Sequence, residues 1–297
     1  MMRIVFIGCV QFSFEMLKHL LLNVSEAEVV GVVTRRQSRF NTDFSPLDSL
    51  AEEFNVPCYY ADETNQIEMA DWVKKLKPDV IYCFGWSYLL KKDVIDIPPI
   101  GVIGYHPAAL PANRGRHPII WALALGLSET ASTFFFIDEG TDTGDILSQV
   151  FVSIEEKDDA LSLYKKLISV ALLQVEKFTK ALVNNTYLRV SQDHSCANYW
   201  RKRTVEDGKI DWRMPARGLY NLVRALTRPY IGAHCIYQDQ EVKIWRTEIT
   251  NLEYRNIEPG KVITIEEGST ILIKCGDGVL RLVEHEFEIL PKAGEYL

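Results

Sequence analysis

Hydrophobic residues in the first half of the chain gather in short runs that alternate with segments of helical spacing. The runs predict strands over residues 3–7, 29–34, 57–60, 80–84 and 101–105, and the spacing predicts helices over 12–22, 46–54 and 66–75. Repeated strand–helix–strand units predict a doubly wound, Rossmann-like parallel sheet with helices on both faces. Ligands of such sheets bind at the carboxyl ends of the strands, so residues there are examined first.

The pattern changes in the second half of the chain. It predicts a helix over 119–125, strands over 132–137 and 146–154, and a long amphipathic helix over 158–183. A helix over 215–225 and several short strands between 233 and 286 predict a small, mainly β, OB-like barrel. The polar stretch between these regions has no periodicity, so we expect domains at 1–184 and 205–297 joined by a linker at 185–204.

Charge and composition exclude several classes of protein. The net charge of −7 disfavours a nucleic-acid partner bound by a broad basic surface. The chain has no run of about 18 apolar residues, as a membrane span requires, and its N-terminus lacks a signal-peptide pattern. Six cysteines without a CxxC pair do not support a zinc site. We expect a cytoplasmic protein without a metal or a membrane partner, and a homodimer stays open.

The loop after the first predicted strand contains one glycine of the three that a dinucleotide-binding turn needs. This disfavours NAD or FAD. The loop nevertheless faces the ligand-binding edge of the predicted sheet, so Gly8, Val10 and Gln11 are candidates for contact with a substrate.

Candidate acid–base chemistry lies at the same edge. His106 directly follows the strand at 101–105, and the acidic turn at 138–145, which contains Asp142, follows the strand at 132–137. A carboxylate beside an imidazole raises the pKa of the ring and fixes its tautomer, as a general acid–base histidine requires. The alternatives are a structural histidine and a solvated acidic loop.

Two arginines follow the histidine along the chain. Arg114 and Arg116 add two guanidinium groups near the predicted site. Such groups bind a carboxylate or a phosphate through paired hydrogen bonds. Equally, both could be exposed residues at the start of the next helix.

Residues 101–149 resemble the folate-dependent formyltransferases, including the methionyl-tRNA and sugar N-formyltransferases. The family pattern runs N-x-H-x-x-x-L-P, then R-G-x-x-P with a following tryptophan, then D-x-G-x-D-x-G-D-I. The resemblance continues at 2–22, at 85–90 and at 210–233. The residues that match the pattern are His106, Leu110, Pro111, Arg114, Gly115, Pro118, Trp121, Asp138, Gly140, Asp142, Gly144, Asp145 and Ile146.

This resemblance implies N10-formyltetrahydrofolate as the cosubstrate and no metal. It implies that His106 is the acid–base group, that Asp142 orients it, and that Arg114 and the loop with Gly8, Val10 and Gln11 contact the acceptor. The folate would be bound by Trp86, Ser87, Leu89, Ala108, Pro111, Arg116, Asp138, Glu139, Gly140 and Thr141.

The sequence departs from the family at one position. Gly104 stands where the family has the asparagine that donates a hydrogen bond to the developing oxyanion. Losing one such donor typically lowers the rate by about a hundredfold to a thousandfold. Either Asn113 or protonated His106 replaces it, or the protein is slow or inactive.

The amine acceptor is inferred from the charge of the C-terminal region and from the local sequence around the candidate site. Residues 204–297 contain 12 Lys and Arg against 15 Asp and Glu, which disfavours tRNA. The sequence of residues 104–127 and 132–149 resembles the sugar N-formyltransferases more closely than the methionyl-tRNA formyltransferases. We therefore expect a nucleotide-linked amino sugar as the acceptor. Methionyl-tRNA formyltransferase, formyltetrahydrofolate hydrolase and a non-catalytic folate binder remain alternatives.

Overall fold

A computed structural model describes residues 1–37, 42–61 and 66–297. These residues form two compact units. Residues 1–115, 130–152 and 165–200 make up the first unit, and residues 116–129, 153–164 and 201–297 make up the second. The domain boundaries expected from the sequence stay a prediction.

The first unit is built on a seven-stranded sheet in the order β3-β2-β1-β4-β5-β7-β8. The four pairings among β1 to β5 are parallel, and β5 pairs with β7 in antiparallel fashion. This confirms the predicted Rossmann-like sheet and adds an antiparallel edge. The strands are β1 (Met2–Ile7), β2 (Ala27–Thr34), β3 (Cys58–Tyr60), β4 (Val80–Cys83), β5 (Gly101–His106), β7 (Glu129–Phe136) and β8 (Ile146–Ser153).

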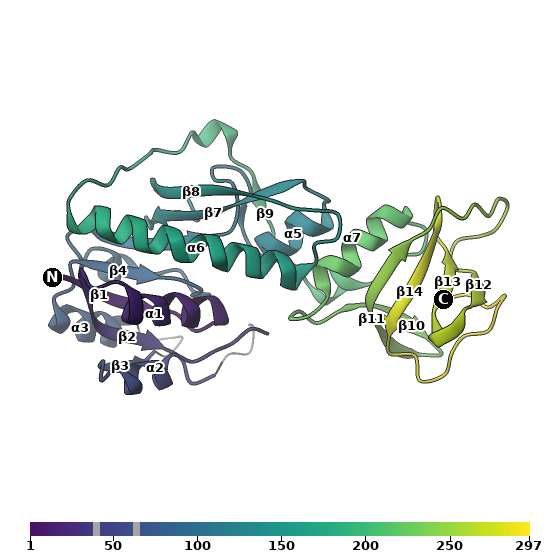
Figure 1. The fold of residues 1–297 in the computed structure, drawn as a ribbon, viewed down its shortest axis with the longest axis horizontal. Coiled ribbons are helices and arrows are strands. Elements are labelled where there is room, and N and C mark those ends of the chain that lie inside the picture. Colours follow the sequence, from purple (N-terminus) through teal and green to yellow (C-terminus); the bar gives the residue numbers. More distant parts are fainter. Residues whose placement is uncertain (38–41, 62–65) are drawn as a thin grey trace. The chain divides into compact units, whose positions relative to one another are not determined.

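Helices cover both faces of this sheet (Figure 1). Phe12 of α1 stacks on Tyr105 of β5 at 4.0 Å between ring centroids. Thr179 of α6 shares a hydrogen bond with Tyr82 of β4 on the same face, and Met69 of α3 packs in a hydrophobic cluster on the opposite face. The helices are α1 (Gln11–Asn23), α2 (Asp48–Glu53), α3 (Gln66–Leu76), α4 (Lys92–Ile95) and α6 (Ala160–Val183).

The alternation of β5 places the candidate histidine. Successive side chains of a strand point to opposite faces. Tyr105 faces α1, whereas Val102 belongs to the cluster beneath α3. Gly104 and His106 therefore share the face of Val102, and His106 lies at the carboxyl end of the strand, where ligands of parallel sheets bind.

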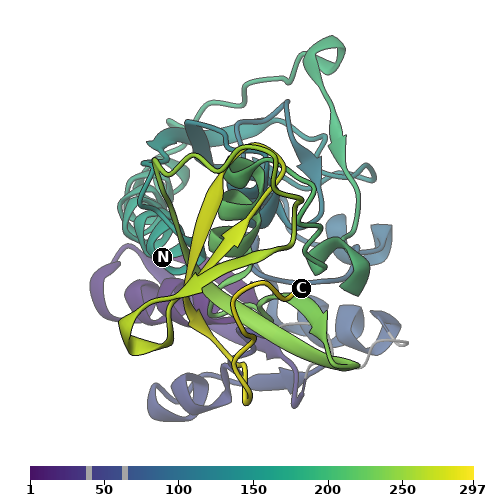
Figure 2. The same cartoon turned by 90° about the vertical axis from the view of Figure 1, so that its right-hand side faces the viewer.

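The second unit contains a five-stranded antiparallel sheet in the order β10-β11-β14-β13-β12. Helix α7 (Ala216–Leu226) packs on β11 and on α5 (Pro118–Ala124), and Figure 2 shows α7 behind the strands of this sheet. The prediction of a small, mainly β region is confirmed. Its strands are β10 (Ala233–Tyr237), β11 (Gln240–Ile249), β12 (Val262–Ile265), β13 (Ile271–Lys274) and β14 (Val279–His285).

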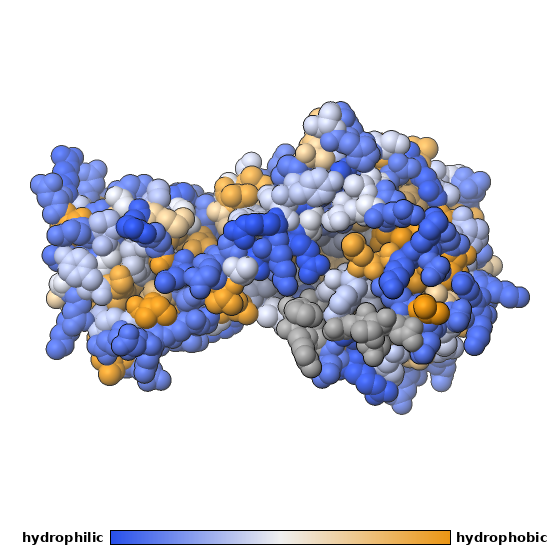
Figure 3. Space-filling view, turned by 180° about the vertical axis from the view of Figure 1, so that it is seen from behind, coloured by the Kyte–Doolittle hydropathy of each residue, from blue (hydrophilic) through white to orange (hydrophobic). Residues whose placement is uncertain are grey.

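Hydrophilic side chains cover most of the face seen in Figure 3, and apolar residues there form scattered groups. Within the described ranges, none of the helices combines the length and the apolar character needed to cross a bilayer. All six cysteines have free thiols, and burial raises the pKa of the Cys235 thiol to about 12.

Candidate functional site

The site in the first unit centres on His106, whose side chain is only 6% exposed. Its Nε2 lies 2.7 Å from the backbone carbonyl oxygen of Asn113. A carbonyl oxygen only accepts hydrogen bonds, so Nε2 carries a proton and donates it. The other ring nitrogen, Nδ1, lies 3.6 Å from Oδ2 of Asp142. The ring thus has a proton on one side and a carboxylate on the other.

Asp142 is held in place by its own loop and by the loop that follows β5. The backbone N–H of Gly115 donates to Oδ2 of Asp142 at 2.9 Å. Asp142 has a φ of 54°, in the left-handed region that aspartate adopts more readily than most residues. The structure therefore brings together the histidine and the carboxylate that the sequence singled out.

Other residues of the acidic turn stabilise the turn or lie on its surface. Oδ1 of Asp138 accepts hydrogen bonds from the backbone of Gly140 at 2.9 Å and from the hydroxyl of Thr143 at 2.5 Å. Glu139 is exposed and forms an ion pair with Lys92 at 3.3 Å, and Thr141 is exposed. Their predicted contact with folate stays a prediction.

Asn113 contributes its backbone to the site and leaves its side chain available. Its backbone N–H donates to Oδ1 of Asn198 at 2.8 Å. Among the described residues, the side-chain amide of Asn113 has no hydrogen-bond partner. This amide is therefore unpaired within the described residues, and its predicted role as the oxyanion donor stays a prediction.

Arg114, which the sequence predicts to contact a substrate, is buried in this structure; that contact stays a prediction. Its side chain is 1% exposed. Its guanidinium donates to Gln192 at 2.7 and 3.2 Å and to the hydroxyl of Tyr199 at 2.9 Å, and it lies 3.0 Å from Nδ1 of His194. A buried cation needs such partners because water is excluded from it. Arg114 therefore stabilises the wall of the site from within.

Sequence reasoning missed the residues that surround Arg114. Gln192, His194, Asn198 and Tyr199 all lie in the stretch that we expected to be a linker. There the short strand β9 (Tyr199–Trp200) pairs with β6 (Arg114–Gly115). The only sequence signal was the number of hydrogen-bonding side chains in a stretch without periodicity, which does not specify their partners.

The loop after β4 has a polar group that its own surroundings leave unpaired. The indole Nε1 of Trp86 is buried and has no hydrogen-bond partner among the described residues. The ring packs edge-on against Tyr88, with 6.1 Å between ring centroids, and Leu89 further along the loop is exposed. Ser87 lies between them. A ligand with an acceptor atom would satisfy the indole N–H.

Backbone groups of the segment after His106 are bonded within the protein, as at Leu110, whose carbonyl accepts from the amide of Gln149 at 2.9 Å. Ala108 is fully buried, and its carbonyl accepts a hydrogen bond from the hydroxyl of Thr133 at 2.7 Å. Pro111 is partly exposed. Their predicted contact with folate stays a prediction.

The loop after β1 packs closely against the end of β4. A Cβ at Gly8 would lie 2.5 Å from the carbonyl oxygen of Phe84, so only glycine fits there. Val10 is buried against Gly85. Gln11, by contrast, is exposed, and its amide donates to Glu15. Of the three candidates in this loop, Gln11 is therefore the one whose side chain is accessible.

Arg116 lies in the second unit, directly before His117. Burial lowers the pKa of His117, and the charge of Arg116 lowers it further. The predicted contact of Arg116 with folate stays a prediction.

The space beside Gly104 is already filled. A Cβ built there would lie 2.9 Å from Cγ1 of Ile137 and 3.1 Å from the ring of Phe135. Contacts below about 3 Å force a neighbour to move, so an asparagine would crowd this face of β5. Gly104→Asn is therefore expected to strain the site instead of restoring the missing amide, and we look to Asn113 or His106 for the donor.

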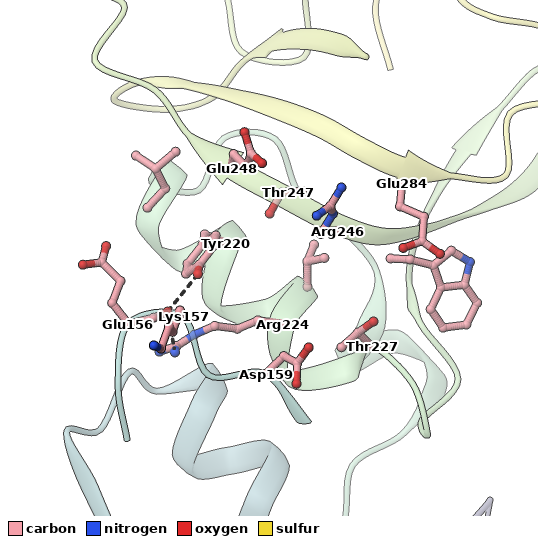
Figure 4. A pocket seen from close by; sticks show the side chains of 13 residues that line it. Glu156, Lys157, Asp159, Tyr220, Arg224, Thr227, Arg246, Thr247, Glu248 and Glu284 are labelled. Atoms are coloured by element: carbon pink, nitrogen blue, oxygen red, sulfur yellow. Dashed lines mark hydrogen bonds between the residues drawn. The ribbon is translucent and has the colours of Figure 1, made fainter. Parts of the chain in front are cut away.

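The second unit contains a pocket of about 390 Å³ between the loop at 156–159, α7 and β11 (Figure 4). Most of its charges are matched within the unit. Glu156 pairs with Arg217, and Glu284 pairs with Arg228, each at 2.6 Å. The guanidinium of Arg224 donates to three backbone carbonyls. Glu156, Glu284 and Arg224 are therefore engaged by partners within the protein.

One hydroxyl in the wall of this pocket is unpaired. Oγ1 of Thr247 is buried without a hydrogen-bond partner among the described residues. An unpaired buried hydroxyl costs about 1–3 kcal/mol, so Thr247→Val should raise the free energy of unfolding by about 1 kcal/mol in a urea titration. Thr179→Val is the matched control, because it breaks the bond to Tyr82 and should lower stability. A less stable Thr247→Val would show that the hydroxyl has a partner.

Within the described part of the chain, no cluster of three or more His, Cys, Asp or Glu side chains could hold a metal ion.

Both halves of the chain match models of known protein families. Residues 2–175 match the model of the formyl transferase family, and residues 202–291 match the model of the formyl transferase C-terminal domain. The chain is 33% identical to a methionyl-tRNA formyltransferase of Caldanaerobacter subterraneus subsp. tengcongensis, over 100% of this chain and 96% of that protein.

Two further relatives carry different names. The chain is 32% identical to the bifunctional polymyxin resistance protein ArnA of Wigglesworthia glossinidia brevipalpis, over 82% of this chain and 36% of that protein. Its fold is similar to an N-formyltransferase from Helicobacter canadensis, solved with folinic acid and dTDP-3-aminofucose. The TM-score is 0.71 at 19% identity, and the match covers 95% of this chain and 99% of that one.

Proposed function

The chain belongs to the formyl transferase family, and we propose that it transfers a formyl group from N10-formyltetrahydrofolate to the amino group of a nucleotide-linked amino-deoxy sugar. The observation that carries this proposal is the arrangement of His106, with a proton on Nε2 and the Asp142 carboxylate facing Nδ1. Formyl transfer to an amine needs a hydrogen-bond donor for the developing oxyanion and a group that moves the amine's proton.

The residues at the carboxyl edge of the sheet fit a folate. The buried indole N–H of Trp86 needs an acceptor, which a pterin ring supplies. Backbone groups at Ser87, Leu89 and from Ala108 to Pro111 would contribute further hydrogen bonds, together with the turn from Asp138 to Thr141. When bound, the folate supplies the formyl group and the nitrogen that leaves.

His106 would act through both of its ring nitrogens. The Nε2 proton, which the Asn113 carbonyl accepts in this structure, would be directed to the formyl oxygen as negative charge develops there. In the doubly protonated ring, with Nδ1–H donating to Asp142, Nε2 would give its proton to the departing nitrogen and then accept the proton that the attacking amine loses. Asp142 would stabilise the doubly protonated ring through Nδ1. The free amide of Asn113 would supply the second donor that Gly104 lacks.

The acceptor is proposed from charge and from the names of relatives. The excess of acidic residues over 204–297 disfavours an acidic polymer such as tRNA. The Helicobacter canadensis enzyme, whose fold this chain shares, was solved with a nucleotide-linked amino sugar. Gln11, at the edge of the site, has an exposed amide that could contact such a substrate.

Methionyl-tRNA is the second candidate acceptor. It is favoured by the 33% identity to a methionyl-tRNA formyltransferase over the whole of this chain. A tRNA partner would require phosphate contacts, so its binding would weaken steeply with salt.

A screen of acceptors separates these functions. The purified protein is incubated with N10-formyltetrahydrofolate and dTDP-, UDP- or GDP-linked amino sugars, and the products are read by mass spectrometry for the gain of one formyl group. We expect one amino sugar to be formylated. Formylation of methionyl-tRNA alone would show that tRNA, and not an amino sugar, is the acceptor. Release of formate without an acceptor would indicate a hydrolase. Folate binding without turnover would indicate a non-catalytic protein.

A further inference from the structure

Residues 190–200, the clamp segment, lie against both loops that carry the candidate site. At one end, Val190 and Ile146 exchange two backbone hydrogen bonds of 2.8 and 2.9 Å beside the acidic turn. At the other end, the carbonyl of Asn198 accepts from the backbone N–H of Arg114 at 3.0 Å. The clamp segment therefore joins two loops that are far apart in the sequence.

Gln192 is the side chain through which the clamp segment reaches the site. Its Nε2 donates to the carbonyl oxygens of Asp142 at 3.0 Å and Gly144 at 2.6 Å. Its Oε1 accepts two hydrogen bonds from Arg114. A primary amide has two donor hydrogens and two acceptor lone pairs, so these four bonds use its full capacity. Gln192 is 7% exposed, which makes each of these bonds costly to lose.

The bond to Asp142 bears on the orientation of the catalytic carboxylate. With a φ of 54°, Asp142 occupies a backbone region that is uncommon for residues other than glycine. The direction of its carbonyl depends on the backbone angles that also set where its carboxylate points. Gln192 thus holds the backbone from which the carboxylate extends, and Oδ2 of that carboxylate lies 3.6 Å from Nδ1 of His106.

We propose that Gln192 is a positioning residue for the proposed formyl transfer: it fixes the acidic turn to Arg114 and thereby fixes Asp142 against His106. This inference rests on the proposed function for its effect on the rate. Among the described residues, the hydrogen bonds of Gln192 go to Arg114, Asp142 and Gly144 and not to the imidazole, so it acts through the backbone of Asp142.

Gln192→Glu separates the two halves of this network. The glutamate has nearly the same shape and keeps both acceptors for Arg114, now as an ion pair. As a carboxylate it cannot donate, and it places negative charge against two carbonyl oxygens. Because a displacement of about 1 Å in a catalytic group can cost about a hundredfold, we expect kcat to fall by about tenfold to a hundredfold. KM for the folate should change by less than about threefold, and the acidic limb of the pH–rate profile should move.

Ser195→Ala is the matched control within the clamp segment. Ser195 is exposed, and within the described ranges it bonds only to its neighbours Asp193 and Cys196, so kcat and the pH profile should stay as in the wild type. Wild-type kcat and pH profile in Gln192→Glu would overturn the proposal. So would a fall in kcat that only follows a lower melting temperature while the pH profile is unchanged.

A spectroscopic measurement keeps the test independent of turnover. The imidazole ¹⁵N shifts of His106, assigned among six histidines by comparison with His106→Gln, report the protonation of each ring nitrogen as the pH is varied. We expect the titration of His106 to differ between the wild type and Gln192→Glu, and identical titrations would overturn the inference. If the wild type formylates no acceptor, the proposed function fails, but the titration still decides whether Gln192 positions Asp142.

Discussion

Replacing His106 by alanine is expected to abolish measurable formyl transfer and to leave the affinity for folate within about tenfold. In the proposed mechanism, the ring would donate from Nε2 to the formyl oxygen and move the amine's proton, and both interactions would strengthen as the bond to the formyl carbon forms. General acid–base groups contribute about a hundredfold to ten-thousandfold to the rate.

The measurement for His106→Ala is kcat in the formylation assay, paired with a fluorescence titration of folate binding. His285→Ala is the control, because this partly buried histidine lies in the second unit and bonds to the backbone carbonyl of Ser269. Near-normal turnover in His106→Ala would remove the imidazole from the mechanism.

Replacing Asp142 by asparagine should lower kcat by about a hundredfold and move the acidic limb of the pH–rate profile. Asparagine has the same shape, tolerates the left-handed backbone of this position and can still accept from the Gly115 N–H through its amide oxygen. The fold of the turn is therefore retained. What is lost is the negative charge that faces Nδ1 of His106.

The pH dependence of kcat, measured from pH 5 to 9 in the two proteins, checks this expectation. The exposed ion-pair residue Asp96, which pairs with Lys92, provides the charge-matched control Asp96→Asn. A profile and a rate that match the wild type in Asp142→Asn would mean that the acidic turn is only a solvated loop.

Asn113 and His106 are the two candidate hydrogen-bond donors to the oxyanion. Gly104→Asn is not expected to supply the donor, because Ile137 and Phe135 fill the space where the asparagine side chain would begin. The sequence alone identified the missing amide. It could not identify the side chain that fills the space beside Gly104, because Ile137 follows another strand, more than thirty residues away.

The sequence by itself determined the Rossmann-like sheet, the mainly β second region and the histidine at the carboxyl end of a strand. Each of these follows from local information. The period of apolar residues specifies strands and helices, and the position of a residue directly after a strand specifies the edge of the sheet on which it lies. The pairing of His106 with Asp142 was predicted on the assumption that both strands end at one edge of the sheet. The structure reaches it differently: β5 and β7 are antiparallel, so β7 ends opposite Ile103, near the start of β5, and Asp142 comes to His106 through the turn that follows β7.

Only the tertiary structure decided how the walls of the site are held. A stretch without periodicity, expected as a linker, supplies Gln192 to the acidic turn and Asn198 to the loop after β5. The same contacts bury Arg114, which sequence reasoning had placed at the substrate. These hydrogen bonds join residues about 50 to 85 positions apart. Partners at such separations are set by how the whole chain packs, because an amide or a guanidinium bonds equally well to any acceptor that packing brings to it.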